Sequence, residues 1–347
     1  MAMRVLYFSE ALVPPFDEGI KKASWHLLRA LQSSHEVLAL TNRGSGIPDG
    51  GVHRVRANRL LLSAGLVRRV RAFAPERTFY FPTACATLFS FVRARVLATY
   101  ARTPVAMVAF QPREYGRLAR VLIPLLRAGP VWAQGEATAT PLRDLGCDVR
   151  ILPPAVDTEA FAPADETQRR VLRAQYGLAP DVPLVLHAGH ILPNRNMQAL
   201  VSLQQALQGE AQVMVVGSSA FGVDEALARA LKDAGAIVIT HYVERLVELY
   251  QMADCYVFPV HSVRGSVEIP LSVLEAMACN LPVVSTPFGE LPRLFPPGDG
   301  VRYVAADADL ADAVRQALAE KPVRTRSRVE GYSWAAAARM LIAGKPA

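Results

Sequence analysis

Short runs of β-branched and aromatic residues alternate with amphipathic stretches along the whole chain. This alternation is typical of parallel sheets whose strands are joined by crossover helices. In the first half the pattern therefore predicts a series of strands, with helices between most of them. The predicted strands are residues 3–9, 35–41, 52–57, 78–82, 104–110, 130–134 and 149–153.

A proline-rich segment at residues 153–166 interrupts this series and shows no helical period. A segment of this kind indicates a linker between domains, because proline cannot continue a helix and favours extended chain. A second series of predicted strands follows the linker. Its members are residues 183–189, 211–217, 236–240, 254–259 and 281–286.

The two series predict an α/β protein with two Rossmann-like domains that face one another across a cleft. The expected domains are residues 1–160 and 161–330, and the C-terminal helix at 331–347 is expected to pack back on the first domain. Open α/β sheets bind ligands beyond the carboxyl ends of their strands. The loops that follow the strands are therefore the candidate site segments.

The composition, with 51% hydrophobic and 20% charged residues, argues for a globular chain, and 347 residues exceed what one core usually covers. No stretch approaches the roughly 18 apolar residues of a membrane span, and the opening MAMRVLYFSE is patterned as a strand rather than a signal peptide. The cysteines are far apart in sequence, which argues against a disulfide framework or a zinc site. We therefore expect a cytoplasmic protein with reduced thiols. The cysteines are Cys85, Cys147, Cys255 and Cys279.

The formal net charge of +7 is unevenly distributed. Residues 1–150 contain 21 lysines and arginines against 10 acidic residues, a net charge of +11. Within them, residues 58–73 combine four arginines with leucine and valine at partly helical spacing. This basic run is expected to attract an anionic membrane or an acidic acceptor, or else forms a solvated basic surface. Nucleic acid is not expected as a partner, because no nucleic-acid-binding signature accompanies the charge.

An apolar segment in the second half carries two carboxylates, Glu268 and Glu275. Pro270 suits the first turn of a helix, and Asn280 suits the left-handed position that ends one. A carboxylate buried in so apolar a helix costs several kcal/mol unless it is hydrogen-bonded. A ribose diol would satisfy Glu275. The alternative places Glu275 at a solvated edge and makes Glu268 an ordinary turn residue.

The start of the same helix is a candidate anion site. Backbone N–H groups around Pro270, Leu271 and Ser272, together with the Ser272 hydroxyl, would favour a phosphate there. Residues 307–309, which read DAD, superficially match a metal-binding motif. They open the amphipathic stretch DLADAVRQAL, so we interpret them as a helix cap, and we expect no metal site.

The run PLSVLEAMACNLPVVST, preceded by YQMADCYVFP and followed by FGELP, resembles the donor-site region of family 4 retaining glycosyltransferases of the GT-B fold. LRDLGCDVRILPPAVDTEAFAP is similar to the passage between that family's domains, and RRVLRAQYGLAPDVPLVLHAGHILPNRN is similar to its entry into the second domain. The N-terminal FSEALVPPFDEGIKKASWHLLRALQSSHEVLALT matches the first strand, glycine-containing loop and helix. The resemblance covers nearly the full chain, and its motifs are specific from about residue 145 to 295.

The resemblance implies roles for individual residues near the helix. Glu275 matches the second glutamate of the family's E-x7-E motif, which holds the nucleotide ribose. The position of the first motif glutamate falls on Val267, so Glu268 stands one residue closer and would need a local backbone shift to bind the transferred sugar. In GHILPNRN, which begins at Gly189, His190 takes the place of a diphosphate-binding arginine and Arg195 that of a lysine.

Three further candidates follow from the same resemblance. Gly19 matches the glycine of the loop that approaches the donor phosphate and the acceptor. Tyr242 stands where relatives contact the base. Gln111 stands nearest the position of a histidine that many relatives carry; it can hydrogen-bond a sugar hydroxyl but cannot act as an acid or base near neutral pH.

The resemblance implies a bacterial-like, metal-independent hexosyltransferase without a cofactor. Such an enzyme moves a sugar from a nucleotide diphosphate to a saccharide or lipid-linked acceptor with retention of configuration. The first domain would bind the acceptor and the second the nucleotide sugar, at the inner face of the membrane. Two alternatives stay open: a nucleotide-sugar epimerase of the same fold, and a catalytically degenerate glycosyltransferase that serves as a binding partner.

Overall fold

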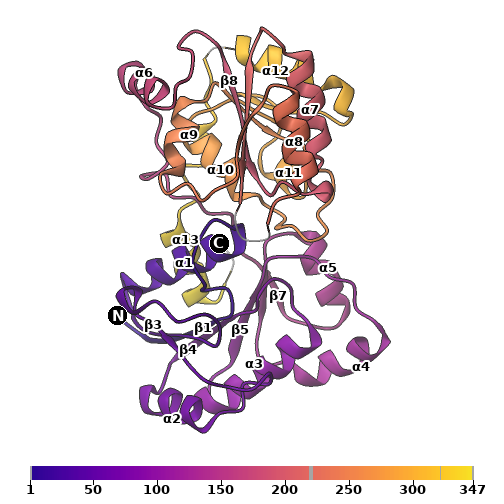
Figure 1. Ribbon diagram of the computed structural model, residues 1–347. Helices are drawn as coiled ribbons and strands as arrows, with labels where there is room; N and C mark the ends of the chain where they lie inside the picture. The colour runs from indigo at the N-terminus through magenta and orange to yellow at the C-terminus, as the bar shows by residue number, and fades with distance from the viewer. Residues whose placement is uncertain (1, 219–221, 321, 346–347) are drawn as a thin grey trace. The chain divides into compact units, whose positions relative to one another are not determined.

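The computed structural model describes residues 2–218, 222–320 and 322–345, which divide into two compact units. The first unit contains the chain up to Pro154, Val263–Glu268, and the chain from Trp334 onwards. The second unit contains Ala155–Ser262 and Ile269–Ser333. Each unit is built around one parallel sheet, as the alternating pattern predicts (Figure 1).

The first unit has a seven-stranded sheet in the order β3-β2-β1-β4-β5-β6-β7. The order reverses direction between β1 and β4, so the connections from these two central strands leave towards opposite faces. This topological switch point is where open α/β sheets usually bind ligands. The strands are β1 (Arg4–Ser9), β2 (Glu36–Thr41), β3 (Val52–Arg54), β4 (Arg77–Phe81), β5 (Val105–Ala109), β6 (Val131–Ala133) and β7 (Val149–Ile151).

Helices cover both faces of this sheet, because β1 and its neighbours are apolar on both sides. Leu6 and Phe8 join the core formed with α2, α3 and α4, whereas the Tyr7 hydroxyl donates to the Ser24 carbonyl of α1 at 2.6 Å on the other side. Helix α13 packs against α1. The helices are α1 (Gly19–Gln32), α2 (Ala64–Phe73), α3 (Leu88–Ala101), α4 (Arg117–Leu126), α5 (Glu136–Asp144) and α13 (Trp334–Ala343), with a 3₁₀ turn η1 (Pro48–Gly50).

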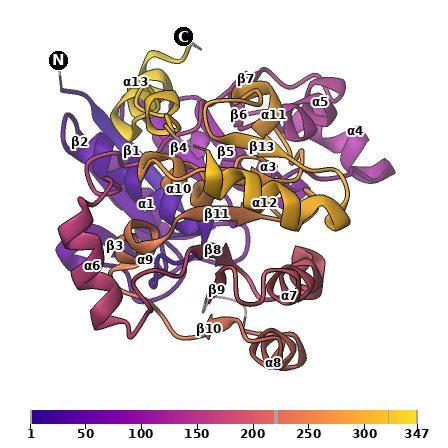
Figure 2. The same cartoon turned by 90° about the horizontal axis from the view of Figure 1, so that it is seen from above.

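The second unit has a six-stranded sheet in the order β10-β9-β8-β11-β12-β13, with its switch point between β8 and β11 (Figure 2). The strands are β8 (Leu184–Gly189), β9 (Gln212–Gly217), β10 (Ile237–Ile239), β11 (Cys255–Phe258), β12 (Val283–Ser285) and β13 (Val301–Tyr303). The helices are α6 (Glu166–Gln175), α7 (Met197–Ala206), α8 (Glu225–Asp233), α9 (Leu246–Met252), α10 (Leu271–Ala278), α11 (Leu291–Leu294) and α12 (Leu310–Ala319). The 3₁₀ turns are η2 (Pro193–Arg195), η3 (Asp307–Asp309) and η4 (Arg326–Arg328).

The predicted strands are found at their expected places, and β13 is the element that the pattern missed. Val301, Arg302 and Tyr303 form too short a run to stand out, and their extended conformation depends on pairing with β12. Helix α13 lies within the predicted range 331–347 and belongs to the first unit.

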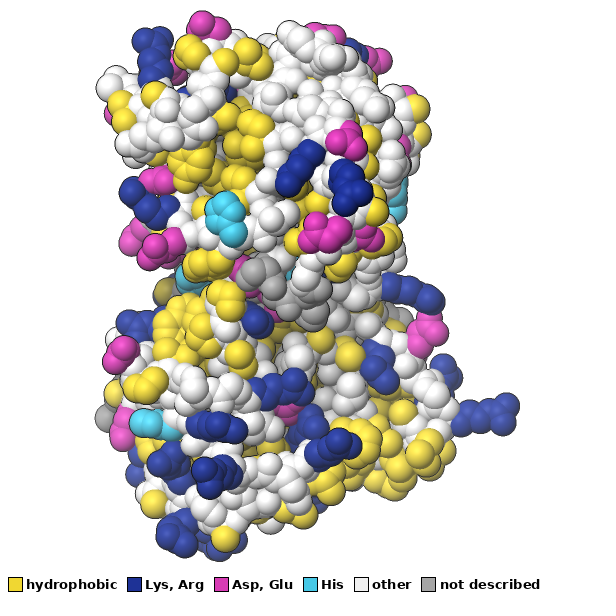
Figure 3. All heavy atoms as spheres, in the orientation of Figure 1, with side chains coloured by type: hydrophobic (Ala, Val, Ile, Leu, Met, Phe, Trp, Pro, Cys, Tyr) yellow, Lys and Arg dark blue, Asp and Glu magenta, His cyan; other side chains and the backbone are white. Residues whose placement is uncertain are grey.

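Lysine and arginine side chains are spread over the visible face of the first unit (Figure 3). This distribution agrees with the net charge of +11 on residues 1–150. Across the described ranges, every helix is too short or too polar to span a bilayer.

Candidate functional site

Helix α10 begins and ends where the sequence predicts. Pro270 is the N-cap residue, with φ −65° and ψ 121°, and the helix proper starts at Leu271. Asn280, with φ 58°, takes the left-handed conformation beyond its end. All residues of α10 except Ser272 are buried, so the helix passes through the interior of the second unit and its start lies at the carboxyl end of β11.

Glu275 lies inside this apolar helix with only 4% of its surface exposed. The Tyr250 hydroxyl of α9 donates a hydrogen bond of 2.9 Å to Glu275 Oε2. Burial raises the pKa of Tyr250 well above its ordinary value, and the neighbouring Glu275 raises it further, so the phenol remains a neutral donor. The alternative of a solvated Glu275 is therefore wrong. Sequence reasoning missed Tyr250 as its partner, although the residue opens the quoted run YQMADCYVFP.

The loop after β8 carries the predicted diphosphate residues. An added Cβ at Gly189 would lie 3.0 Å from His187 Nε2, so a side chain at 189 would crowd the imidazole. His190 and Arg195 follow within seven residues, are half-buried, and lie close enough to His187 for their charges to lower its pKa. The structure thus brings Gly189, His190 and Arg195 together at the carboxyl end of β8.

His187 lies beneath this loop and is buried. Its Nδ1 is 2.9 Å from the Val257 carbonyl oxygen, which only accepts, so Nδ1 carries the proton. Among the described residues, Nε2 has no hydrogen-bond partner. Desolvation, with smaller contributions from Arg195 and His190, lowers the pKa of His187 to about 4, so the ring is neutral at neutral pH.

Asn196 ends the η2 turn directly after Arg195, in the left-handed conformation with φ 55° and ψ 39°. Its Nδ2 donates to both carboxylate oxygens of Asp307 at 3.0 Å and to the Pro259 carbonyl at 3.0 Å. His261 Nε2 lies 2.9 Å from Asp307 Oδ1. We call these three side chains, Asn196, Asp307 and His261, the loop brace, because they connect the segments that follow β8, β11 and β13.

The loop brace corrects the expectation that residues 307–309 cap a helix. Helix α12 starts at Leu310 with Asp309 as its N-cap residue, but within the described ranges no Asp309 side-chain bond caps it. Asp307 instead accepts from Asn196, 111 residues earlier in the chain. A pairing across that separation is set by the sheet order, which local pattern does not reveal.

Two further contacts link the loops at the switch point of the second sheet. Tyr256 of β11 donates its hydroxyl to the Ala188 carbonyl at 3.2 Å and also hydrogen-bonds Ser272. The predicted residues of the β8 loop and of α10 therefore gather at the carboxyl ends of β8 and β11, where the fold favours a ligand. Tyr242 lies apart from them, beyond the end of β10 and 49% exposed, and its contact with a base stays a prediction.

Glu268 belongs to the first unit, and only 1% of its surface is exposed. Its two carboxylate oxygens accept from the backbone N–H groups of Ala137 and Thr138, each at 2.9 Å. These groups lie at the start of α5, whose N-cap residue is Gly135 and offers no capping side chain. Glu268 supplies the missing carboxylate at the positive end of the helix dipole. Its predicted contact with the transferred sugar stays a prediction.

Gly19 and Gln111 lie at the carboxyl edge of the first sheet. Gly19 is the first residue of α1, and the Glu18 side chain accepts from the N–H groups of Ile20 and Lys21, both at 3.3 Å. An added Cβ at Gly19 would meet the Val267 side chain at an ordinary 3.7 Å. Gln111 follows β5 and is half-buried. Their roles stay predictions.

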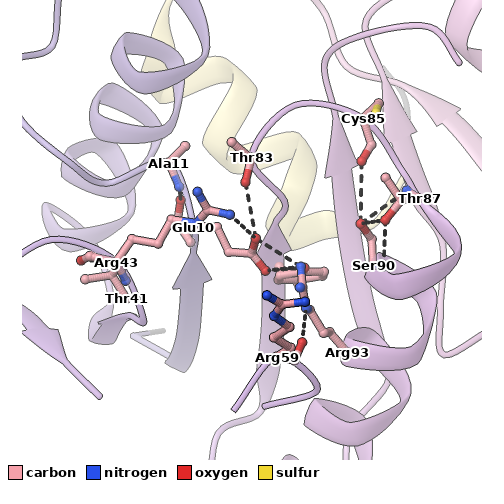
Figure 4. Close-up of polar contacts among 12 residues, drawn as sticks. Glu10, Ala11, Thr41, Arg43, Arg59, Thr83, Cys85, Thr87, Ser90 and Arg93 are labelled. Carbon is pink, nitrogen blue, oxygen red and sulfur yellow. Dashed lines mark hydrogen bonds and ion pairs between the residues drawn. The ribbon is translucent and has the colours of Figure 1, made fainter. Parts of the chain in front are cut away.

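A buried polar cluster at the switch point of the first sheet escaped the sequence reasoning (Figure 4). Glu10 follows β1 and is 2% exposed. It accepts from the Tyr80 hydroxyl at 2.7 Å, from Thr83 Oγ1 at 3.2 Å and from Arg93 at 2.9 and 3.1 Å. Arg43, half exposed at the end of β2, lies 3.8 Å from the same carboxylate. Two arginines therefore lie within ion-pair distance of one glutamate in this cluster.

Comparisons with known proteins point to glycosyltransferases. Residues 182–320 match the family model described as Glycosyl transferases group 1. A D-inositol 3-phosphate glycosyltransferase of Mycobacteroides abscessus is 30% identical over 207 residues, covering 56% of this chain and 45% of that protein. A GDP-mannose-dependent monoacylated alpha-(1-6)-phosphatidylinositol monomannoside mannosyltransferase of Corynebacterium glutamicum is 24% identical over 202 residues, covering 53% and 52%. The chain spans about half the length of the curated relatives it matches.

Solved structures extend the likeness to the whole chain. The Anabaena protein Alr3699/HepE, crystallised in complex with UDP, has a TM-score of 0.78 at 15% identity, and 99% of each chain is covered. Sucrose-phosphate synthase of Thermosynechococcus elongatus has a TM-score of 0.76 at 18% identity, covering 99% of this chain and 100% of that one. The two parallel sheets with alternating helices, and these neighbours, confirm the predicted α/β fold of the GT-B type.

Proposed function

We propose that the protein is a retaining, family 4 glycosyltransferase that moves a sugar from a nucleotide diphosphate donor to an acceptor. The observation that carries the proposal is the gathering of Arg195, His190, the α10 start and buried Glu275 at the switch point of one sheet. The donor diphosphate binds at the β8 loop and the α10 start, and Glu275 holds the ribose. The match of residues 182–320 to the family model supports the assignment.

The chemistry follows from where charge develops. As the bond to the sugar breaks, negative charge grows on the leaving diphosphate. Arg195 is a permanent cation that can engage phosphate oxygens in two directions, and the N–H groups at the α10 start add fixed dipoles. These groups stabilise the leaving group without a metal ion. His190 contributes a hydrogen bond, and Glu268 contacts the transferred sugar.

The acceptor binds at the carboxyl edge of the first sheet. This edge carries Glu10 and its arginines at the switch point, and Gln111 after β5. The excess of basic residues in the first half of the chain favours an acceptor with an anionic group, either a saccharide or a lipid-linked sugar. The names of two relatives include D-inositol 3-phosphate and phosphatidylinositol monomannoside, which both contain an anionic phosphate, and this supports the choice. A lipid-linked acceptor also calls for peripheral contact of the first unit with the inner face of the membrane.

A thermal-shift screen with UDP, GDP, ADP and their sugar conjugates tests the donor assignment. Arg195→Gln is expected to abolish the stabilisation that one of these nucleotides gives the wild type. Arg170→Gln is the matched control, because Arg170 is an exposed arginine of α6 paired with Glu166 in the same unit. An equal thermal shift in Arg195→Gln and wild type, or no shift with any nucleotide, contradicts the proposal.

Turnover of the stabilising donor then separates the remaining readings. Release of nucleoside diphosphate that depends on an acceptor supports transfer. Interconversion of the donor sugar without any acceptor identifies an epimerase. Binding without either reaction identifies a degenerate glycosyltransferase, so each outcome is distinct.

A further inference from the structure

Helix α4 of the first unit carries a row of exposed apolar side chains. Leu118, Val121 and Leu125 are 67%, 66% and 75% exposed. Their spacing of three and four residues places them on one side of the helix. Ile123 is fully buried and anchors the opposite side in the core that α2, α3 and α4 share. The helix is therefore packed on one side and presents leucine and valine on the other.

The helix against which α4 packs also exposes an apolar side chain. Helix α4 packs against α3, whose second residue, Phe89, is 59% exposed. Hydrophobic side chains gather with arginines over this part of the first unit (Figure 3). Exposed apolar side chains that share one side of a helix mark an interaction site more often than single scattered residues do. We call Phe89, Leu118, Val121 and Leu125 the apolar ridge.

The charge around the apolar ridge identifies its partner. Residues 112–130, which contain α4, include four arginines and one acidic residue, Glu114. Glu114 is paired with Arg264 at 2.5 Å, which cancels its charge locally. Arg117 and Arg120 of α4 and Arg127 just beyond it are exposed. A basic rim around leucine, valine and phenylalanine is complementary to an anionic lipid surface, whose headgroups attract the arginines while the apolar side chains enter the acyl boundary.

The basic run at residues 58–73 exposes less apolar surface: Leu62 is 50% exposed, but it precedes helix α2. Its helix α2 buries Leu66 and Val70 in the core. Arg68, Arg69 and Arg71 stay exposed, but the apolar half of the amphipathic pattern is already used inside the protein. Helix α4 differs because it buries Ile123 in the core and also exposes Leu118, Val121 and Leu125.

We propose that the apolar ridge and its arginine rim dock the first unit on an anionic phospholipid membrane. The docking itself does not depend on the proposed function. Its purpose does, because docking would hold the enzyme where a lipid-linked acceptor lies. It deepens the peripheral contact proposed above by naming the helix that makes it and the lipid charge that it needs. The arginines draw the unit to the surface, and Leu118, Val121 and Leu125 hold it there.

Vesicle co-sedimentation of the full-length chain tests the inference without any donor or acceptor. Vesicles of phosphatidylcholine mixed with phosphatidylglycerol in equal parts are compared with vesicles of phosphatidylcholine alone. The wild type is expected to sediment with the anionic vesicles at low salt. With the zwitterionic vesicles it is expected to remain in the supernatant. The double variant Leu118→Gln/Leu125→Gln is expected to bind the anionic vesicles at least tenfold more weakly, and Arg117→Glu likewise.

The matched control is Val171→Gln, which changes an exposed valine of α6 in the second unit, 51% exposed, and is expected to bind as the wild type does. All variants should keep the wild-type melting temperature, since the changed side chains are exposed. Absence of binding to anionic vesicles, or equal binding by the wild type and the double variant, overturns the proposal. So does a wild-type dimer that the double variant converts to a monomer while vesicle binding stays unchanged, because the ridge would then join two copies of the chain.

The two proposals fail in different experiments. Loss of vesicle binding in the α4 variants with an intact nucleotide-induced thermal shift leaves the donor assignment standing and supports docking. Vesicle binding with no response to any nucleotide leaves docking standing and contradicts the glycosyltransferase.

Discussion

The loop brace leads to a sharp prediction, because it ends the turn that carries Arg195. Replacing Asp307 by alanine removes the acceptor of two Asn196 Nδ2 contacts at 3.0 Å and of the His261 contact at 2.9 Å. Asn196 Nδ2 keeps the Pro259 carbonyl as an acceptor, so it is not left orphaned. Asn196 then has less to hold it in the left-handed conformation, and Arg195 is less well ordered before a ligand binds.

The size of the effect follows from the exposure of the brace. Hydrogen bonds to a charged group contribute about 1.5–3 kcal/mol when buried. Asp307 and His261 are 46% and 47% exposed, so solvent screening reduces this contribution to about 1 kcal/mol. If this free energy is needed to order the loop when the ligand binds, the dissociation constant for the nucleoside diphosphate rises by about fivefold, at 1.4 kcal/mol per tenfold.

Titration calorimetry with the nucleotide that stabilises the wild type measures this change. Asn196→Gly provides the decisive second variant, because glycine adopts a φ near 55° without steric cost and needs no brace. In the Asn196→Gly background, Asp307→Ala is expected to have no further effect, which makes the double-mutant cycle non-additive. Asp312→Ala, an exposed aspartate of α12 paired with Arg315, is the matched control. Equal affinities of Asp307→Ala and wild type, or full additivity with Asn196→Gly, would refute the reasoning.

Two predictions concern stability. The pKa of His187 is about 4 in the folded protein and 6.5 for the free side chain, so the unfolded chain binds more protons between these pH values. The free energy of unfolding is therefore expected to fall as the pH drops from 6.5 to 4. The decrease is about 3 kcal/mol, at 1.36 kcal/mol per pKa unit. In denaturant titrations across that window His187→Leu should lose this part of the pH dependence, and an unchanged slope would show that the imidazole titrates normally. Glu268→Ala leaves the N–H groups of Ala137 and Thr138 without their carboxylate, so the free energy of unfolding is expected to fall by about 2–4 kcal/mol. Glu268→Gln keeps one acceptor oxygen and is expected to lower the free energy of unfolding by less. Loss of transfer activity in Glu268→Ala at unchanged stability would instead favour a direct contact with the sugar.

The periodicity of the chain was sufficient to predict two parallel sheets and the bounds of α10. Both depend on local physics. A strand reveals itself by a run of β-branched residues, and Pro270 and Asn280 restrict the backbone at their own positions whatever surrounds them. The candidates at the end of β8 were implied by the family resemblance, and Glu275 of α10 stood out as a carboxylate in an apolar helix. Sheet topology explains why these two segments lie near each other, since the loops after central strands of a parallel sheet meet at one edge.

The partners of the charged side chains were decided by the tertiary structure. Glu268 caps a helix that starts 132 residues earlier, Asp307 braces Asn196 across 111 residues, and Glu10 pairs with Arg93 across 83. A carboxylate in an apolar segment signals that a partner is required, since burial without one costs several kcal/mol. Which partner satisfies it depends on the order of the strands and on the packing of the helices between them. The sequence by itself therefore determined the elements and the need for paired charges, and only the packed sheets decided which residues meet, because spatial contact is set by topology rather than by distance along the chain.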